Sequence, residues 1–168
     1  MATITFKGNP IHTAGNLPEK GRKAPAFKLA TGDLVDVGLD AFAGKVKILN
    51  IVPSLDTPVC ALSAKRFNED VAPLKDVVLL NVSADLPFAQ KRFCESQSLS
   101  HVVSLSTFRN PGFGKDYGVL IVDSPLAGLL SRAVLVLDKH DTVAYAQQVP
   151  EIAQEPDYAA ALQTVKTT

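Results

Sequence analysis

The sequence is poor in the residues that build disulfide frameworks and metal sites. It holds only two cysteines, Cys60 and Cys94, among its 168 residues. Two cysteines are too few for a secreted disulfide framework, and too few for a zinc site made of cysteine alone. The three histidines, His12, His101 and His140, stand apart and lack the helical i,i+4 spacing of metal ligands. We therefore expect neither a disulfide-rich fold nor a metal centre.

An excess of one charge and a long apolar run are also missing. The 17 basic and 17 acidic residues balance to a formal net charge of zero and are spread along the chain. This distribution predicts no nucleic-acid or membrane surface and favours a small, uncharged or mildly polar substrate. No apolar run approaches membrane-spanning length, and residues 1–10 show no charged-then-apolar leader. We expect a cytoplasmic protein, a compartment in which paired thiols most often do transient redox chemistry.

What is present is the composition of an ordinary globular protein. Hydrophobic residues make up 46% and charged residues 20% of a chain long enough to bury a sizeable core. No repeat, low-complexity tract or linker divides the chain, so we expect one domain over residues 1–168.

Apolar periodicity predicts alternating strands and helices. The alternation at residues 3–6, followed by a turn at 7–10, predicts an N-terminal β-hairpin. Further strands or extended pieces are expected at 26–30, 35–37, 46–52, 77–83, 102–105, 118–123, 132–138 and 142–149. A helical turn is expected at 39–42, a helix between Cys60 and Pro73, a helix carrying Cys94, a short helix at 112–117 and a closing helix after Pro156. This order is that of a thioredoxin-like α/β fold, a mixed central sheet flanked by helices.

The helix that carries Cys94 has a start signal and an apolar stripe. Asp85 is a good N-cap, because Pro87 then falls in the first turn, where its missing N–H costs little. We expect Leu86, Ala89 and Phe93 to form the inner face of this helix.

The stretch from Pro53 to Cys60 is the strongest candidate site. It joins an apolar strand to a helix, so Cys60 falls at a helix N-terminus, where free N–H groups favour negative charge. The thiolate is the reactive form of cysteine. The hydroxyl of Thr57, three residues upstream, can turn toward the sulfur or its substrate. Free cysteine is also among the most buried residue types, so an inert core residue remains the alternative.

The pattern P-x-x-x-T-x-x-C over residues 53–60 resembles the signature of the peroxiredoxins. The whole chain resembles their atypical two-cysteine subfamily, the bacterial thiol peroxidases. Beside the signature, the matching words lie at residues 6–10, 83–89, 92–94, 105–109 and 155–158.

The resemblance implies a role for each of five residues. Cys60 corresponds to the peroxidatic cysteine, and Cys94 to the resolving cysteine that converts a Cys60 sulfenic acid to an intramolecular disulfide. Thr57 corresponds to the hydroxyl that binds the peroxide, Pro53 to the residue that shields the sulfur, and Arg132 to a distant active-site arginine. The resemblance further implies reduction of alkyl hydroperoxides and hydrogen peroxide, re-reduction by thioredoxin, a homodimer, and no cofactor.

The chemistry agrees with these residue types. A guanidinium and a hydroxyl fixed in advance stabilise the negative charge that develops on the leaving oxygen better than water does. An arginine at the start of a strand is otherwise usually a solvated strand end. Lys91, Arg92 and Glu95 predict partial exposure of Cys94. Because the two cysteines lie on different helices and a disulfide needs Cα atoms within roughly 7 Å, we predict local unwinding during the cycle.

Three other functions remain as alternatives. A redox switch or binding module would use the same cysteines without rapid turnover. A cysteine hydrolase would need a histidine base, and none of the histidines has a motif context. A structural protein with two inert thiols would leave the 53–60 pattern unexplained.

Overall fold

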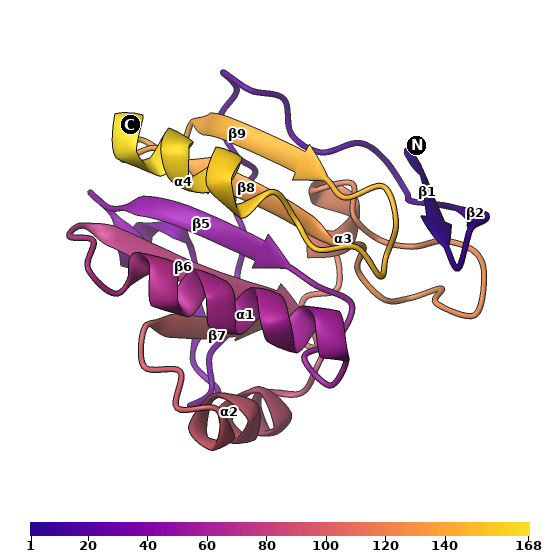
Figure 1. Cartoon of the computed structure of the whole chain (residues 1–168), viewed down its shortest axis with the longest axis horizontal. Helices are drawn as coiled ribbons and strands as arrows, with labels where there is room; N and C mark the ends of the chain where they lie inside the picture. Colours follow the sequence, from indigo (N-terminus) through magenta and orange to yellow (C-terminus); the bar gives the residue numbers. More distant parts are fainter.

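The computed structural model describes all 168 residues and contains a central seven-stranded sheet (Figure 1). The strand order is β4-β3-β7-β6-β5-β8-β9. These strands are β3 (Leu29–Ala30), β4 (Asp36–Val37), β5 (Val46–Ile51), β6 (Val77–Ser83), β7 (Val102–Ser106), β8 (Ala133–Leu137) and β9 (Val143–Gln148). Strands β5, β6 and β7 are parallel, whereas β8 lies antiparallel to β5 and β3 lies antiparallel to β7.

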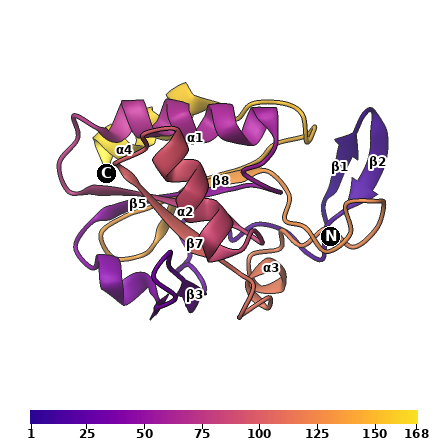
Figure 2. The same ribbon diagram turned by 90° about the horizontal axis from the view of Figure 1, so that it is seen from below.

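Helices flank both faces of the sheet, as predicted. They are the 3-10 helix η1 (Leu39–Phe42), α1 (Pro58–Val71), α2 (Pro87–Ser96), α3 (Phe113–Asp116) and α4 (Tyr158–Thr167). Figure 2 shows α1 and α4 on one face of the sheet and α3 on the other, while α2 packs against β7 and lies below it in Figure 1. None of these helices has the length and apolar character needed to cross a membrane.

The alternation of side chains along β5 explains why both faces are covered. Val46 and Ile48 pack into the apolar cluster under α1 and α4, which includes Phe67. Leu49 and Ile51 point the opposite way, into the cluster that holds Phe113. Full burial of side chains of this size contributes about 1.5–3 kcal/mol each, so a strand that is apolar on both faces is stable only between two layers.

The predicted N-terminal hairpin is confirmed as β1 (Thr3–Phe6) and β2 (Asn9–His12), which pair antiparallel. It forms a sheet of its own at one end of the molecule (Figure 2). Ile4 and Ile11 hold it there, because they pack against Ile121 and Ile152 in a small apolar cluster.

Element ends follow the proline and capping signals. Helix α1 stops at Val71, just before Pro73. Helix α4 begins after Asp157, whose carboxylate accepts a hydrogen bond from the Ala160 N–H at 3.0 Å. Two extended predictions were too long. Only Leu29–Ala30 of segment 26–30 is a strand, and 118–123 contributes isolated bridges rather than a strand.

The predicted inner face of α2 is wrong for Leu86 and Ala89, whereas Phe93 does pack inward, against the cluster that holds Leu55 and Cys60. Leu86 is 55% exposed, Ala89 is exposed and Phe93 is only partly buried, whereas the buried residues of the helix are Pro87 and Gln90. The physical reason is position, because α2 packs mainly against β7, and only Pro87 and Gln90 of the helix are buried there.

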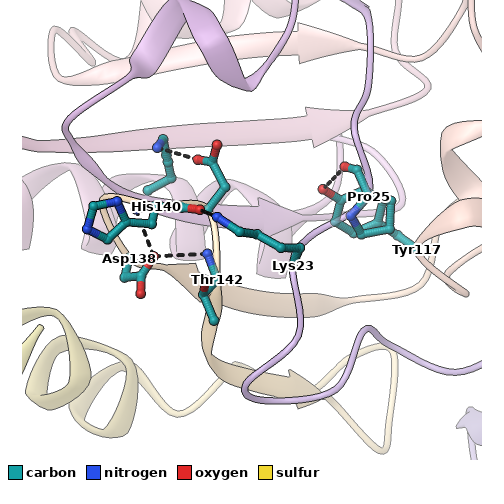
Figure 3. Close-up of polar contacts among 8 residues, drawn as sticks. Lys23, Pro25, Tyr117, Asp138, His140 and Thr142 are labelled. Carbon is teal, nitrogen blue, oxygen red and sulfur yellow. Dashed lines mark hydrogen bonds and ion pairs between the residues drawn. The ribbon is translucent and has the colours of Figure 1, made fainter.

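The far end of the sheet, away from the Cys60 loop, is held by the turn between β8 and β9. Figure 3 shows Asp138 accepting hydrogen bonds from the backbone N–H groups of His140 and Thr142, at 2.8 and 2.9 Å. Lys47, a fully buried residue of β5, forms an ion pair with Asp141 of this turn at 2.5 Å. One of the two fully buried cations of the molecule is therefore neutralised by a carboxylate.

Candidate active site

Three chain segments meet at the edge of the sheet where the parallel strands β5 and β6 end. The first is the loop after β5, which leads into α1. The second is the loop after β6, which leads into α2, and the register places it beside the first because Ile51 pairs with Val82. The third is the chain entering β8, whose Ala133 pairs with Ile51 from the other side. Carboxyl ends of parallel strands are where ligand sites of α/β sheets form.

Cys60 lies in the first turn of α1, as predicted, and is fully buried. It belongs to an apolar cluster with Val52, Leu55 and Ala64. Its sulfur has one charged neighbour, because Arg132 Nη2 lies 3.2 Å from Cys60 Sγ in hydrogen-bonding geometry. The structure thus places a positive charge against a sulfur that carries negative charge as a thiolate.

Arg132 is 1% exposed, so it is not the solvated strand end that its sequence position would usually suggest. Its Nε donates a hydrogen bond to the backbone oxygen of Ile152 at 2.8 Å, which fixes the direction of the side chain. Its Nη1 is buried and has no hydrogen-bond partner within the protein. No carboxylate forms an ion pair with it. A buried guanidinium with a free donor is costly unless another group uses that donor.

Thr57 and Pro53 lie on the loop that leads to Cys60. Thr57 is the N-cap residue of α1, but its side chain does not cap the helix; its hydroxyl donates to the Ser54 backbone oxygen at 2.9 Å. Thr57 also lines a cavity of about 780 Å³ between this loop and α2. Pro53 is buried at the start of the loop.

Cys94 lies on α2 and is partly buried, in agreement with the predicted partial exposure. Its sulfur is 3.3 Å from the Ser104 hydroxyl of β7. Burial raises the pKa of the Cys94 thiol above its ordinary 9.0; the Ser104 hydrogen bond opposes that rise and the charge of Glu95 adds to it. Cys60 and Cys94 are both free thiols, and Cys94 packs against the apolar cluster that contains Cys60.

Asp85 is the site residue whose role sequence reasoning missed. The prediction that it caps α2 is wrong, because the N-cap residue is Leu86 and no side chain caps this helix. The Asp85 carboxylate instead accepts hydrogen bonds from Ser54 Oγ at 2.7 Å, the Leu55 N–H at 2.8 Å and Ser83 Oγ at 2.7 Å. The loop after β5 approaches Asp85 only in the folded sheet, so no local pattern announces this contact.

No group of three or more His, Cys, Asp or Glu side chains is placed to hold a metal ion. The arrangement offers a buried sulfur, a cation with a free donor beside it and a second thiol nearby. Such a set can perform thiolate chemistry on a substrate that accumulates negative charge on oxygen.

Comparison with known proteins gives concordant matches over nearly the whole chain. The Redoxin family matches residues 19–162. A thiol peroxidase of Mycobacterium tuberculosis is 54% identical over 162 residues, which cover 96% of this chain and 97% of the relative. Among solved structures, a peroxiredoxin-like protein from Aquifex aeolicus is 44% identical with a TM-score of 0.93, over 99% of this chain and 97% of that one. A thiol peroxidase from Chromobacterium violaceum has the same fold, with a TM-score of 0.91 at 24% identity over 98% and 95% of the two chains.

Proposed function

This chain belongs to the Redoxin family and is a thiol peroxidase, an enzyme that reduces peroxides, in which we propose two roles. Cys60 is the peroxidatic cysteine, and Cys94 is the resolving cysteine. The substrates are alkyl hydroperoxides and hydrogen peroxide, and the electrons come from thioredoxin.

In the first step, the Cys60 thiolate attacks the terminal oxygen of the hydroperoxide. An S–O bond forms and the O–O bond breaks, so Cys60 is oxidised to a sulfenic acid while the peroxide is reduced. The leaving alkoxide takes up a proton and departs as an alcohol. Negative charge grows on the leaving oxygen, and donors fixed in place lower the barrier to that change.

The observation that carries this proposal is the environment of Arg132. Its Nη2 contacts Cys60 Sγ at 3.2 Å, and its buried Nη1 has no partner in the protein. A peroxide oxygen bound beside the sulfur would use that donor, so one guanidinium would serve both the nucleophile and the leaving group. The Thr57 hydroxyl supplies a second donor for the peroxide, and the buried Pro53 shields the sulfur from water.

In the second step, the deprotonated Cys94 attacks the sulfur of the Cys60 sulfenic acid. An S–S bond forms, the S–O bond breaks, and hydroxide leaves and takes up a proton to become water. The two sulfurs have different partners in the reduced protein, Arg132 for Cys60 and Ser104 for Cys94. We therefore propose that the segments around Cys60 and Cys94 unwind locally before the bond forms.

The partner and the setting are proposed on chemical grounds. A thioredoxin dithiol donates two electrons by thiol–disulfide exchange, and the partly exposed Cys94 is the more accessible sulfur for its attack. The exposed apolar side chains Leu86, Phe88 and Phe108 suit burial in a homodimer. A cytoplasmic location fits two thiols that must cycle between reduced and oxidised forms.

The test is intact mass and a free-thiol count after one equivalent of an organic hydroperoxide. The wild-type protein should lose both thiols and gain no oxygen. Cys60→Ser should keep its remaining thiol and its mass, whereas Cys94→Ser should gain one oxygen on Cys60. Survival of both thiols in the wild-type protein would contradict the proposal. Steady-state turnover with thioredoxin then separates a peroxidase from a redox switch, because a switch forms the same disulfide without rapid turnover.

A further inference from the structure

Asp85 binds the loop that precedes Cys60 with both oxygens of its carboxylate. Oδ1 accepts the hydrogen bond from Ser54 Oγ at 2.7 Å, and Oδ2 accepts one from the Leu55 backbone N–H at 2.8 Å. Bonds to a carboxylate are shorter and stronger than bonds between neutral groups. Two consecutive residues of the Cys60 loop are thereby tied to a single side chain of the loop that leads into α2.

The two hydrogen bonds to Asp85 hold the loop residues that position Thr57 and Cys60. The backbone oxygen of Ser54 accepts the hydroxyl of Thr57 at 2.9 Å, so the position of Ser54 sets the position of Thr57. Leu55 is 3% exposed and packs in the apolar cluster that holds Cys60. The Asp85 carboxylate therefore fixes the loop on its polar side, and Leu55 fixes it on its apolar side.

Asp85 itself is anchored to the sheet and not only to the loop. Ser83 Oγ, at the end of β6, donates to Oδ2 at 2.7 Å, and Ser106 Oγ of β7 donates to the Asp85 backbone oxygen at 2.6 Å. The buried Gln90 of α2 donates to the same Ser83 hydroxyl at 3.0 Å. The carboxylate thus joins the Cys60 loop to the carboxyl end of β6.

Apolar packing joins the loop to α2 at Leu55, because Phe93 and Cys94 of α2 pack against the cluster that holds Leu55 and Cys60. The rest of the loop stands apart from the helix. A cavity of about 780 Å³ lies between them, lined by Thr57 and Pro58 on the loop side and by Arg92 and Phe93 on the helix side. A cavity supplies no contacts across its width. The polar link between the loop and the segment that leads into α2 is the pair of hydrogen bonds to Asp85.

We propose that Asp85 is a positioning residue, a latch that holds the Cys60 loop in the peroxide-reactive geometry and whose release lets the Cys60 sulfenic acid reach Cys94. This role rests on the functions proposed above for the two cysteines. Asp85 touches neither sulfur and acts only through the loop. It sets how the sulfenic acid divides between disulfide formation with Cys94 and further oxidation by a second peroxide.

The latch acts in opposite directions on the two steps. Attack on peroxide needs Cys60 beside Arg132 and Thr57 in place, which is the latched arrangement. Disulfide formation needs Cys60 to leave Arg132, which the latch opposes. Weakening the latch should therefore slow sulfenic acid formation, speed disulfide formation and protect Cys60 from oxidation to sulfinic acid. A loss of general stability would not separate the two rates in this way.

The experiment compares Asp85→Ala, which removes the carboxylate, with Ser54→Ala, which removes one bond from the loop side only. Asp85→Asn is the conservative variant, because its amide retains hydrogen-bonding capacity without the charge. Asp138→Ala is the matched control, because Asp138 accepts two backbone N–H bonds in the β8–β9 turn at the far end of the sheet. Rapid quenching with a thiol-blocking reagent, followed by intact mass, measures disulfide formation. Sulfenic acid formation is measured in a Cys94→Ser background with a dione that traps sulfenic acids.

We expect disulfide formation to accelerate about tenfold in Asp85→Ala, which corresponds to about 1.4 kcal/mol, and about threefold in Ser54→Ala. Sulfenic acid formation should slow in both, and the sulfinic fraction at excess peroxide should fall. Asp85→Asn should lie between wild type and Asp85→Ala, and Asp138→Ala should match wild type in both rates.

The role is overturned if disulfide formation is unchanged or slower in both Asp85→Ala and Ser54→Ala. It is also overturned if both rates rise together, since the loop would then gate peroxide entry instead of holding the reactive geometry. Failure of the proposed function looks different: the wild-type protein itself would form no disulfide between Cys60 and Cys94, and the role of Asp85 would fall with it.

Discussion

Replacing Arg132 with methionine should leave the fold about as stable as before while removing most of the peroxide reactivity. The prediction follows from the difference between the two fully buried cations. Lys47 is paired with Asp141 at 2.5 Å, whereas Arg132 has no carboxylate partner and keeps one donor, Nη1, unused. A buried charge without a counter-ion opposes folding. The presence of the Arg132 guanidinium therefore indicates a role in catalysis.

The stability terms for Arg132→Met nearly cancel. The substitution removes the hydrogen bond to the Ile152 backbone oxygen, and an unsatisfied buried carbonyl costs about 1–3 kcal/mol. It also removes the unpartnered Nη1, a penalty of the same size and opposite sign, and relieves the desolvation of a buried cation. We therefore expect the free energy of unfolding to change by less than about 1.5 kcal/mol or to rise.

The kinetic term has no such compensation. Removing one fixed donor to a developing oxyanion typically costs about 10²–10³-fold in rate, or about 2.7–4 kcal/mol. The assay is the second-order rate constant for loss of the Cys60 thiol with an organic hydroperoxide, measured beside thermal unfolding. Arg132→Lys keeps the positive charge but lacks the planar guanidinium, so its rate constant should lie between those of wild type and Arg132→Met. The matched control is Lys47→Met, which should lower stability because Asp141 loses its partner, and should leave the rate constant unchanged.

An Arg132→Met protein that reacts with peroxide within about threefold of wild type would refute the reasoning. A large loss of stability together with nearly intact reactivity would refute it as well, because Arg132 would then be a structural residue.

Three further predictions concern pH and local unwinding. A hydrogen bond from Thr5 holds the pKa of Glu151 below its ordinary 4.5, so the stability that this carboxylate contributes is full above pH 4.5 and is lost as the pH falls through the lowered pKa. The difference in unfolding temperature between wild type and Glu151→Gln should accordingly shrink below pH 4.5; a constant difference would contradict this. Because burial raises the pKa of Cys94 above 9.0, disulfide formation should accelerate by about tenfold per pH unit from neutral pH toward 9, and quenched-flow data that level off well below pH 9 would contradict it. Hydrogen exchange around Cys60 and Cys94 should be faster in the disulfide form than in the reduced form, and identical exchange would exclude local unwinding.

The parts of the fold that depend on local chain properties could be predicted from the sequence. The run at residues 77–83 is apolar throughout, and it forms β6 with the same bounds because a strand covered on both faces needs no polar side. Pro73 limits α1, and Asp157 starts α4, because each acts within one turn of its own position. The placement of Cys60 in the first turn of α1 follows from the same local rules.

The contacts that complete the site could not be predicted, because they join residues far apart in the chain. Asp85 has the right spacing to cap α2, but the sheet brings the loop after β5 beside it, and the loop supplies better donors. Arg132 immediately precedes β8, and the acceptor for its buried side chain comes from Ile152, in the segment that follows β9. For Arg132 and Thr57, the proposed roles came from the resemblance of the 53–60 signature and the whole chain to the peroxiredoxins, whereas nothing in the sequence indicated a contact between Asp85 and the Cys60 loop.

The contacts beneath the first turn of α1 favour the proposed local unwinding around Cys60. The Cys60 backbone oxygen accepts a hydrogen bond from Ser63 Oγ at 3.0 Å, and that hydroxyl accepts one from Asn50 Nδ2 at 3.3 Å, which also donates to Asn81 Oδ1 at 2.9 Å. Asn50 Oδ1 and Asn81 Nδ2 are buried without partners. An incompletely satisfied polar network stabilises what rests on it less than an apolar core does. The later turns of α1 rest instead on Phe67, in the cluster between α1, α4 and the sheet. The first turn can therefore open at a lower free energy than the rest of the helix, which supports the proposed local unwinding around Cys60.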